Sequence, residues 1–253
     1  MFRYLLTVVI VITGEMGLPL QVHAESASRM LNRVDQYRLR LPEAKVVTLV
    51  KLYKDNTLDK TRLYWVYTHP ERKSLVLFKS NVEDGQKLLM LSDNFWLLMP
   101  NSHRPIRITP MQKLLGSASI GDIATLNWSE QYTADYTGLS NIDMHGQSFV
   151  EAKLVLNAKN KAVTYKKIIL WVNPQTDFPI RADLYLQSQK LAKQAFFYPD
   201  NKEHPNKIVS MTLLDRIRPN LKTVIEYQEV TPYHLDDKYY NPAYLIRQSR
   251  VDG

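Results

Sequence analysis

The chain has 253 residues, no cysteine and a formal net charge of +8. Without cysteine it can form no disulfide, no thiolate metal site and no cysteine-linked lipid anchor. The length suits one large β domain or two small ones, and it can bury a sizeable core. The basic residues are scattered, which favours a solvated surface; attraction to anionic headgroups or to an acidic partner stays open.

The first residues predict a secretory signal peptide. Arg3 makes the N-terminal region positively charged, the segment from Leu5 to Thr13 is apolar, and Val22-His23-Ala24 fits a small-x-small cleavage site. The apolar run is short for a transmembrane helix, so an uncleaved N-terminal anchor is the alternative reading. We expect cleavage after Ala24, a signal peptide over residues 1–24, one mature domain over 25–253 and a periplasmic location.

Most of the mature chain is predicted to be β-strand. Ser26 to Tyr37 is the exception, because its apolar residues recur at helical spacing. After Pro42, alternating apolar segments separated by turns predict an antiparallel meander. About eleven such strands are expected, over residues 45–54, 61–68, 74–80, 86–91, 95–99, 148–156, 165–172, 180–186, 191–198, 207–214 and 221–230.

The stretch from Phe95 to Ile123 is the most informative. Its order predicts a strand, a proline corner, a short helix over Met111–Leu115 and a flexible loop over Gly116–Asp122. A sheet with a movable lid fits this order, and so does a hairpin with a helical connector.

The parts outside these strands are less regular. Trp128, Tyr132 and Tyr136 are four residues apart and could lie on a helix. Asn141–Gly146 is predicted to turn, and Asn241–Arg247 to form a short helix.

These elements predict a mainly β (α+β) fold. No βαβ alternation occurs, so a parallel sheet is not expected. A large curved antiparallel sheet, or an incomplete β-barrel, with one apolar face fits best. The few short helices would then cover a hydrophobic cavity, although a second sheet could also cover the face.

Motifs for catalysis are absent from the sequence. The six histidines are dispersed and form no HExxH, there is no GxSxG, and Gly116–Gly121 lacks the Gly-Lys-Ser/Thr ending of a phosphate loop. We therefore predict no enzyme activity, no catalytic residue, no metal site and no cofactor. A lipid hydrolase would require a Ser/His/Asp cluster around His103. Nucleic-acid binding is not expected either, because the aromatic residues fit strands better than an exposed stacking surface.

Apolar and aromatic side chains remain as candidates for a binding site. An acyl chain offers no hydrogen bonds, so its cavity needs apolar walls. We predict ligand contacts from a cavity wall, a lid and a basic rim. The wall would comprise Trp65, Phe78, Trp96, Leu98 and Trp171, the lid Leu114 and Leu115, and the rim Arg104 and Arg107.

The segment from Gly85 to Ile123 resembles the LolA-like outer-membrane lipoprotein-sorting proteins. The matching motifs are Trp96-x-x-x-Pro100, Arg104-Pro105-Ile106-Arg107-Ile108 and Leu115-Gly116-x-x-Ser119-x-Gly121-Asp122. The segments from Leu154 to Lys159 and from Ile169 to Val172 resemble the family's second half, and Leu191-Ala192-Lys193 lies where the family often has a Leu-Lys step. The resemblance implies an incomplete antiparallel barrel with helices closing a hydrophobic cavity.

The same resemblance implies a function. It indicates a periplasmic carrier, or chaperone, that shields the acyl chains of a lipoprotein or lipid for outer-membrane sorting. Its partners would be that cargo, an ABC-type inner-membrane exporter (permease) and, transiently, a membrane surface. Relatives on this fold also include envelope regulators that sense lipid or lipoprotein, and this alternative stays open.

Overall fold

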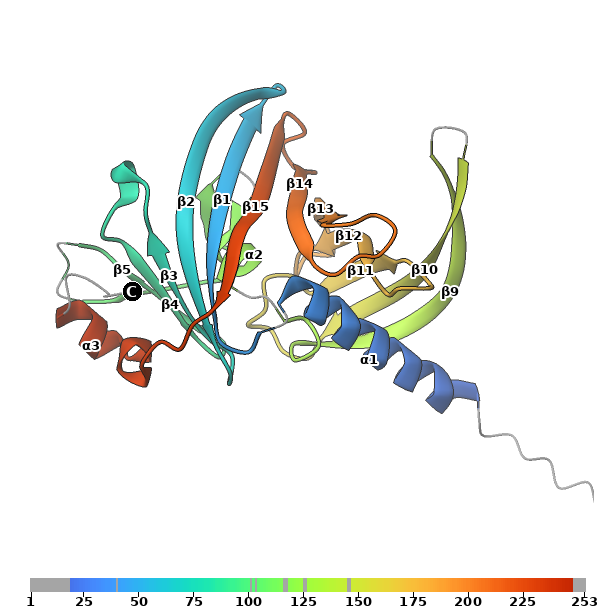
Figure 1. Ribbon diagram of the computed structural model, residues 1–253, viewed down its shortest axis with the longest axis horizontal. Helices are drawn as coiled ribbons and strands as arrows, with labels where there is room; N and C mark the ends of the chain where they lie inside the picture. Colours follow the sequence, from blue (N-terminus) through green and yellow to red (C-terminus); the bar gives the residue numbers. More distant parts are fainter. Residues whose placement is uncertain are drawn as a thin grey trace, which may run out of the picture.

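The computed structural model describes residues 19–39, 41–100, 102, 104–115, 118–124, 127–144 and 147–247. Thirteen strands form one open, curved sheet in the order β6-β5-β4-β3-β2-β1-β15-β14-β13-β12-β11-β10-β9 (Figure 1). Neighbouring strands are all antiparallel. The predicted fold class is confirmed.

The sheet consists of two meanders that meet at its centre. The first comprises β1 (Ala44–Lys54), β2 (Thr57–His69), β3 (Lys73–Phe78), β4 (Lys87–Leu91), β5 (Asn94–Leu98) and β6 (Ile106–Ile108). The second comprises β9 (Tyr132–Met144), β10 (Gln147–Ala158), β11 (Lys167–Val172), β12 (Pro179–Tyr185), β13 (Leu191–Pro199), β14 (Ile208–Asp215) and β15 (Leu221–Pro232). The pairing of β1 with β15, from Ala44↔Pro232 to Lys54↔Leu221, joins the two meanders.

The remaining elements are short, apart from one helix. A small second sheet pairs β7 (Lys113–Leu115) with β8 (Ala118–Ser119). The helices are α1 (Pro19–Arg38), α2 (Ile120–Ala124), α3 (Pro242–Arg247), η1 (Asn81–Glu83) and η2 (Asp237–Tyr240). No helix within the described ranges has the length and hydropathy to cross a membrane.

The inner face of the sheet carries the main core. Alternate side chains of most of the thirteen strands point to this face, since successive residues of a strand face opposite sides. Helix α1 supplies Ala27, Leu31, Val34 and Tyr37 to the same core, and α2 supplies Ile123. The inner face is therefore packed with side chains where we expected a cavity.

The outer face of β2–β5 carries a second core. It contains Tyr67, Leu75 and Leu89, and it is covered by the C-terminal segment through Tyr240 and Leu245. Both faces of these strands are consequently buried, as the run of buried residues in β3 shows. In the second meander the outer face has no such cover among the described residues.

Several local predictions were wrong. Residues 113–115 of the predicted helix Met111–Leu115 form strand β7, and the predicted flexible loop contains β8 and α2. Trp128 precedes β9, while Tyr132 and Tyr136 lie on one face of that strand, because a spacing of four is also two repeats of a strand. β6 was missed because it has only three residues.

The other differences concern the ends of elements. β9 continues through Asn141 to Met144, where a turn was predicted. α1 extends over Ser26–Tyr37, as expected, and begins earlier, at Pro19, so that the predicted cleavage site after Ala24 lies within it. The predicted C-terminal helix is confirmed as α3.

Candidate functional site

Helix α1 covers the inner face of the second meander, where it packs on β9. Its C-terminal end is fixed by polar bonds. The carboxylate of Asp35 accepts the backbone N–H groups of Trp128 (2.8 Å) and Ser129 (2.7 Å). Burial raises the pKa of Asp35, and these hydrogen bonds oppose that rise. The Tyr37 hydroxyl donates to the carbonyl oxygen of Thr176 at 2.7 Å.

The indole of Trp128 lies beside this end of α1 on the inner side. The Arg38 guanidinium stacks over its ring at 4.3 Å, and the Phe197 ring meets it edge-on with centroids 6.1 Å apart. A small cavity of about 20 Å³ borders Trp128. The apolar part of α1, from Ala27 to Val34, is held by packing against the core.

A larger pocket of about 350 Å³ opens at the rim, where α1 joins β1. One wall is apolar and the other is polar. The apolar wall consists of Leu39, Leu41, Pro42 and Met90, and the polar wall of residues 68–74 with Asn127, Glu130 and Gln131. Arg72 in the polar wall forms ion pairs with Asp93 and, at 3.7 Å, with Glu130. The pocket thus joins solvent to the edge of the inner core, since Leu39 and Leu41 pack against it.

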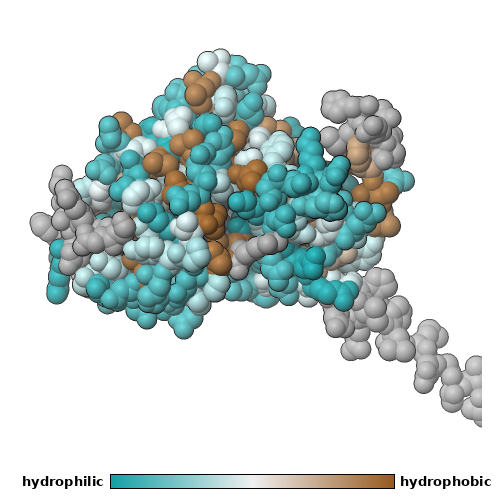
Figure 2. All heavy atoms as spheres, in the orientation of Figure 1, coloured by the Kyte–Doolittle hydropathy of each residue, from teal (hydrophilic) through white to brown (hydrophobic). Residues whose placement is uncertain are grey.

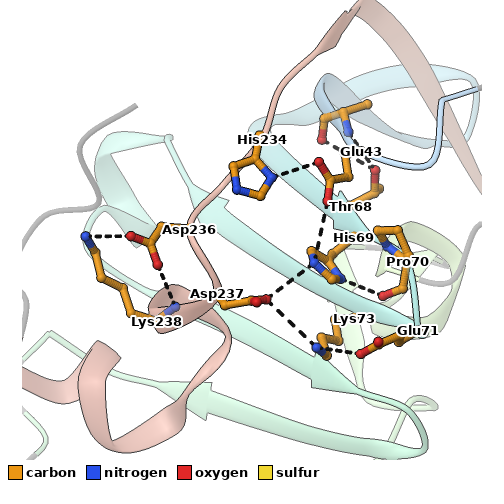
Figure 3. A network of polar contacts seen from close by, with 11 residues as sticks. Glu43, Thr68, His69, Pro70, Glu71, Lys73, His234, Asp236, Asp237 and Lys238 are labelled. Atoms are coloured by element: carbon orange, nitrogen blue, oxygen red, sulfur yellow. Dashed lines mark hydrogen bonds and ion pairs between the residues drawn. The ribbon is translucent and has the colours of Figure 1, made fainter.

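A network of polar contacts lies beside this pocket and joins it to the C-terminal segment (Figure 3). His69 Nε2 lies 3.5 Å from Glu43 Oε1 and 3.3 Å from Asp237 Oδ1. The other oxygen of Glu43 lies 2.8 Å from His234 Nδ1. Glu43 therefore bridges two histidines, one from the pocket wall and one from the segment that leads to η2 and α3.

This network predicts a pH dependence. The hydrogen bond to Glu43, and then its charge, raise the pKa of His234 above its ordinary value of 6.5. Because the folded-state pKa is raised, the stabilising effect is complete below about pH 6.5 and disappears as pH rises through the folded-state pKa. We expect the difference in Tm between the unchanged chain and His234→Gln to be larger near pH 5.5 than near pH 8.5. Equal differences at both pH values would show that the contact does not titrate.

A second cluster of polar side chains lies inside the core. Lys193 Nζ is 2.5 Å from Asp122 Oδ2, and the two side chains are 6 % and 4 % exposed. The same carboxylate accepts the Ser119 N–H (2.8 Å), the Ser119 hydroxyl (2.7 Å) and, on Oδ1, the Tyr165 hydroxyl (2.7 Å). Tyr132 extends the cluster by donating to the Tyr165 carbonyl oxygen at 2.8 Å.

This buried cluster fixes α2 to the sheet. Burial by itself would raise the pKa of Asp122, but the charge of Lys193 and the hydrogen bonds hold the pKa below its ordinary value. The carboxylate is therefore ionised and paired. Ser119 and Asp122 belong to the segment predicted to be a flexible loop, yet their contacts with β13 and Tyr165 anchor that segment.

Gly121 allows the close approach of α2 to Thr164. A Cβ atom at position 121 would lie 1.8 Å from Thr164 Oγ1 and 3.0 Å from Thr164 Cβ. We expect Gly121→Ala to lower the free energy of unfolding by roughly 1–3 kcal/mol, as overpacking of a core does. Urea unfolding measures this loss, and a second change, Thr164→Ala, should recover part of it. Full stability of Gly121→Ala alone would contradict the contact.

The predicted site residues do not line one common cavity. Phe78 lies on the inner face and meets Tyr64 edge-on. Trp65, Trp96 and Leu98 lie on the outer face with the C-terminal cover. Trp171 is also outside the inner core, with the Arg181 guanidinium 3.7 Å from its ring centre.

The predicted rim residues lie at the edge of the first meander, beside and within β6, and the predicted lid residues belong to the small second sheet. Arg104 and Arg107 are exposed, and Arg107 lies over the Trp96 ring at 6.0 Å. The backbone of Leu114 and Leu115 is in β7, but their side chains, like His103, lie outside the described residues. Whether any of these residues contacts a ligand stays a prediction.

The sequence analysis missed the residues that cover and border the inner face. Leu31 and Val34 were recognised only as a helical stripe, and Trp128 as part of a possible helix. Lys193 was predicted only as part of a strand and Asp122 as part of a loop, and both matched the family's motifs. One feature of the sequence could have suggested that Lys193 and Asp122 pair. Each is a charged residue within a segment of otherwise apolar or small residues.

Comparisons with known proteins gave one family model and several solved structures with the same fold. A family model with the description "Uncharacterized protein" matches residues 70–247. The crystal structure of a LolA superfamily protein from Nitrosomonas europaea is 25% identical, with a TM-score of 0.76 over 86% of this chain and 98% of that one. No curated protein matches the sequence.

Two further crystal structures share the fold. A DUF1329 family protein from Desulfovibrio piger is 22% identical, with a TM-score of 0.70 over 88% of this chain and 99% of that one. A putative outer membrane lipoprotein-sorting protein domain from Vibrio parahaemolyticus is 18% identical, with a TM-score of 0.67 over 88% and 100%.

Proposed function

Because the chain belongs to the family whose model matches residues 70–247, and because it has the LolA-superfamily fold that its sequence resembles, we propose that it binds acyl chains of a lipoprotein or lipid in the periplasm. The proposed role is that of a non-enzymatic carrier. The observation that carries the proposal is the apolar inner face of a thirteen-stranded sheet, covered by α1 and α2.

The proposed binding site is the inner face beneath α1. Side chains fill this space in the present conformation, so an acyl chain must displace α1 or α2. The buried ion pair holds α2, whereas Ala27–Val34 of α1 contacts the core through apolar side chains. We therefore assign the movable cover to α1, with its end at Asp35–Tyr37 as the fixed point.

The rim pocket is the proposed entrance. Its apolar wall adjoins the core, and its polar wall can face a headgroup or the peptide of a lipoprotein. Apolar burial stabilises the bound chain by about 25 cal/mol per Å² removed from water. An ABC-type inner-membrane exporter is the proposed donor, since an acylated cargo must leave a membrane before it can be shielded.

Native mass spectrometry of the protein purified from a periplasmic fraction tests this proposal. We expect a species that carries the mass of one or more acyl lipids, on a polypeptide that begins at Glu25. A ligand-free mass under conditions that preserve the lipid of a known carrier would contradict lipid binding. A polypeptide that retains residues 1–24 would contradict the proposed export by a cleaved signal peptide.

A further inference from the structure

Two turns project together from one end of the sheet. Asp55 and Asn56, both with positive φ, connect β1 to β2, and residues 216–220 connect β14 to β15. The Asp55 N–H donates to the carbonyl oxygen of Asn220 at 3.0 Å, so the turns touch. They lie at the top of the molecule in Figure 1.

An exposed aliphatic side chain lies beside the first turn, in β2, and another lies within the second turn. Leu58 is 50% exposed and Ile217 is 49% exposed. β2 pairs with β3 only from Tyr64 onwards, so within the described ranges no strand pairs with the tip of the β1–β2 hairpin on that side. Figure 2 shows hydrophobic atoms within a mostly hydrophilic surface at this end. The aliphatic groups are therefore raised above the body of the protein.

Basic side chains surround these aliphatic groups. Lys54 and Lys60 are exposed beside Leu58, Arg216 is exposed beside Ile217, and Lys222 is half-buried near both turns. The nearby exposed carboxylates are Asp55 and Asp59, while the buried Asp215 pairs with Arg218 at 3.2 Å. The cations outnumber the carboxylates, so this end is positively charged.

The β9–β10 hairpin adds exposed apolar groups on the same side of the molecule (Figure 1). Leu139 is 62% exposed, and Phe149 and Val150 are 47% and 46% exposed. Val150 and Phe149 are consecutive in β10, so they point to opposite faces of the hairpin. A flat protein partner could cover only one of these faces, whereas a lipid layer surrounds both.

We propose that this end of the molecule docks on an anionic lipid surface, with Leu58 and Ile217 in the headgroup layer and Lys54, Lys60 and Arg216 against the lipid phosphates. Apolar groups that enter the interface and cations that meet anionic headgroups are the two attractions that hold peripheral proteins on membranes. Isolated aliphatic tips suit a soft lipid layer better than a protein interface, whose fully buried centre is contiguous and depleted of charge. The assignment stands independently of the proposed acyl-chain site.

Co-sedimentation of the full chain with vesicles tests the docking face. We expect binding to phosphatidylcholine vesicles that contain about one third phosphatidylglycerol, weakened by salt, and about tenfold weaker binding to phosphatidylcholine alone. Leu58→Ser/Ile217→Ser and Lys54→Gln/Lys60→Gln should each weaken binding to the anionic vesicles by about tenfold. These positions are exposed, so circular dichroism should show an unchanged fold.

Matched control variants at other places complete the test. Val230→Ser changes an aliphatic residue that is 36% exposed and far along β15, and Lys202→Gln/Lys207→Gln changes the turn at the other end of β14. We expect both to bind vesicles like the unchanged chain. No binding by the unchanged chain, or an equal loss in the controls, would overturn the proposal. If the Leu58→Ser/Ile217→Ser and Lys54→Gln/Lys60→Gln variants still bind a fluorescent fatty acid, the docking face is distinct from the proposed acyl-chain site.

Discussion

Replacing Lys193 with methionine is expected to lower the free energy of unfolding by about 3–5 kcal/mol, because it leaves a buried carboxylate without its counter-charge. Lys193 and Asp122 are almost fully buried and 2.5 Å apart. Ser119 and Tyr165 would still donate hydrogen bonds to Asp122, but neutral donors do not replace a positive charge. Urea unfolding followed by circular dichroism measures the loss.

Two further variants isolate the buried charge as the cause. The double change Asp122→Asn/Lys193→Met removes both charges and should recover a large part of the lost stability. Lys51→Met breaks a half-exposed ion pair with Glu226, of similarly short distance at 2.6 Å, and should cost no more than about 1 kcal/mol. If Lys193→Met were no more costly than Lys51→Met, the cluster would not anchor α2.

Replacing Leu31 with alanine is expected to have opposite effects on stability and on ligand binding. Leu31 lies on the core-facing side of α1 and is only 1% exposed, so its truncation should lower the free energy of unfolding by about 2–5 kcal/mol. The space left behind is apolar, and such cavities stay dry and accept apolar ligands. A fluorescent acyl probe should therefore bind more tightly and raise the Tm of Leu31→Ala more than that of the unchanged chain.

The exposed neighbour Asn32 provides the control on the same helix. Asn32→Ala changes the solvent side of α1 and should leave both the stability and the probe affinity nearly unchanged. Weaker probe binding by folded Leu31→Ala would contradict a site beneath α1. The ligand would then contact another surface of the sheet.

The sheet could be predicted from the sequence because its signals are local. Apolar alternation identified eleven of the thirteen strands, and turn residues such as Asp55-Asn56 separated them. The segment with Tyr132 and Tyr136 was predicted as a possible helix because a spacing of four residues fits both a helix and one face of a strand. The pairing of β1 with β15 could not be predicted, since it joins segments that are far apart in the chain.

The candidate site was harder to predict because it depends on which face of the sheet is covered. β2–β5 are apolar on both faces, so alternation could not assign Trp65 and Trp96 to the outer one. The segment Gly116–Asp122 has small and polar residues that indicate a loop. Its anchor, Lys193, lies 71 residues away from Asp122, and a contact of that range leaves no local pattern.

The four tryptophans allow the most direct test of a site on the inner face. Trp128 borders the inner cavity, whereas Trp65 and Trp96 lie with the outer core and Trp171 stacks with Arg181 outside the inner core. Bromine atoms on an acyl chain quench indole fluorescence only at contact. One variant would keep Trp128 alone, with phenylalanine at the other three positions, and a second would replace only Trp128.

The measurement is a titration of both delipidated variants with a brominated fatty acid. We expect saturable quenching of the variant that retains Trp128 and no quenching of the variant that retains Trp65, Trp96 and Trp171. Quenching of the outer tryptophans with an unquenched Trp128, or no saturable quenching of either variant, would contradict acyl-chain binding on the inner face.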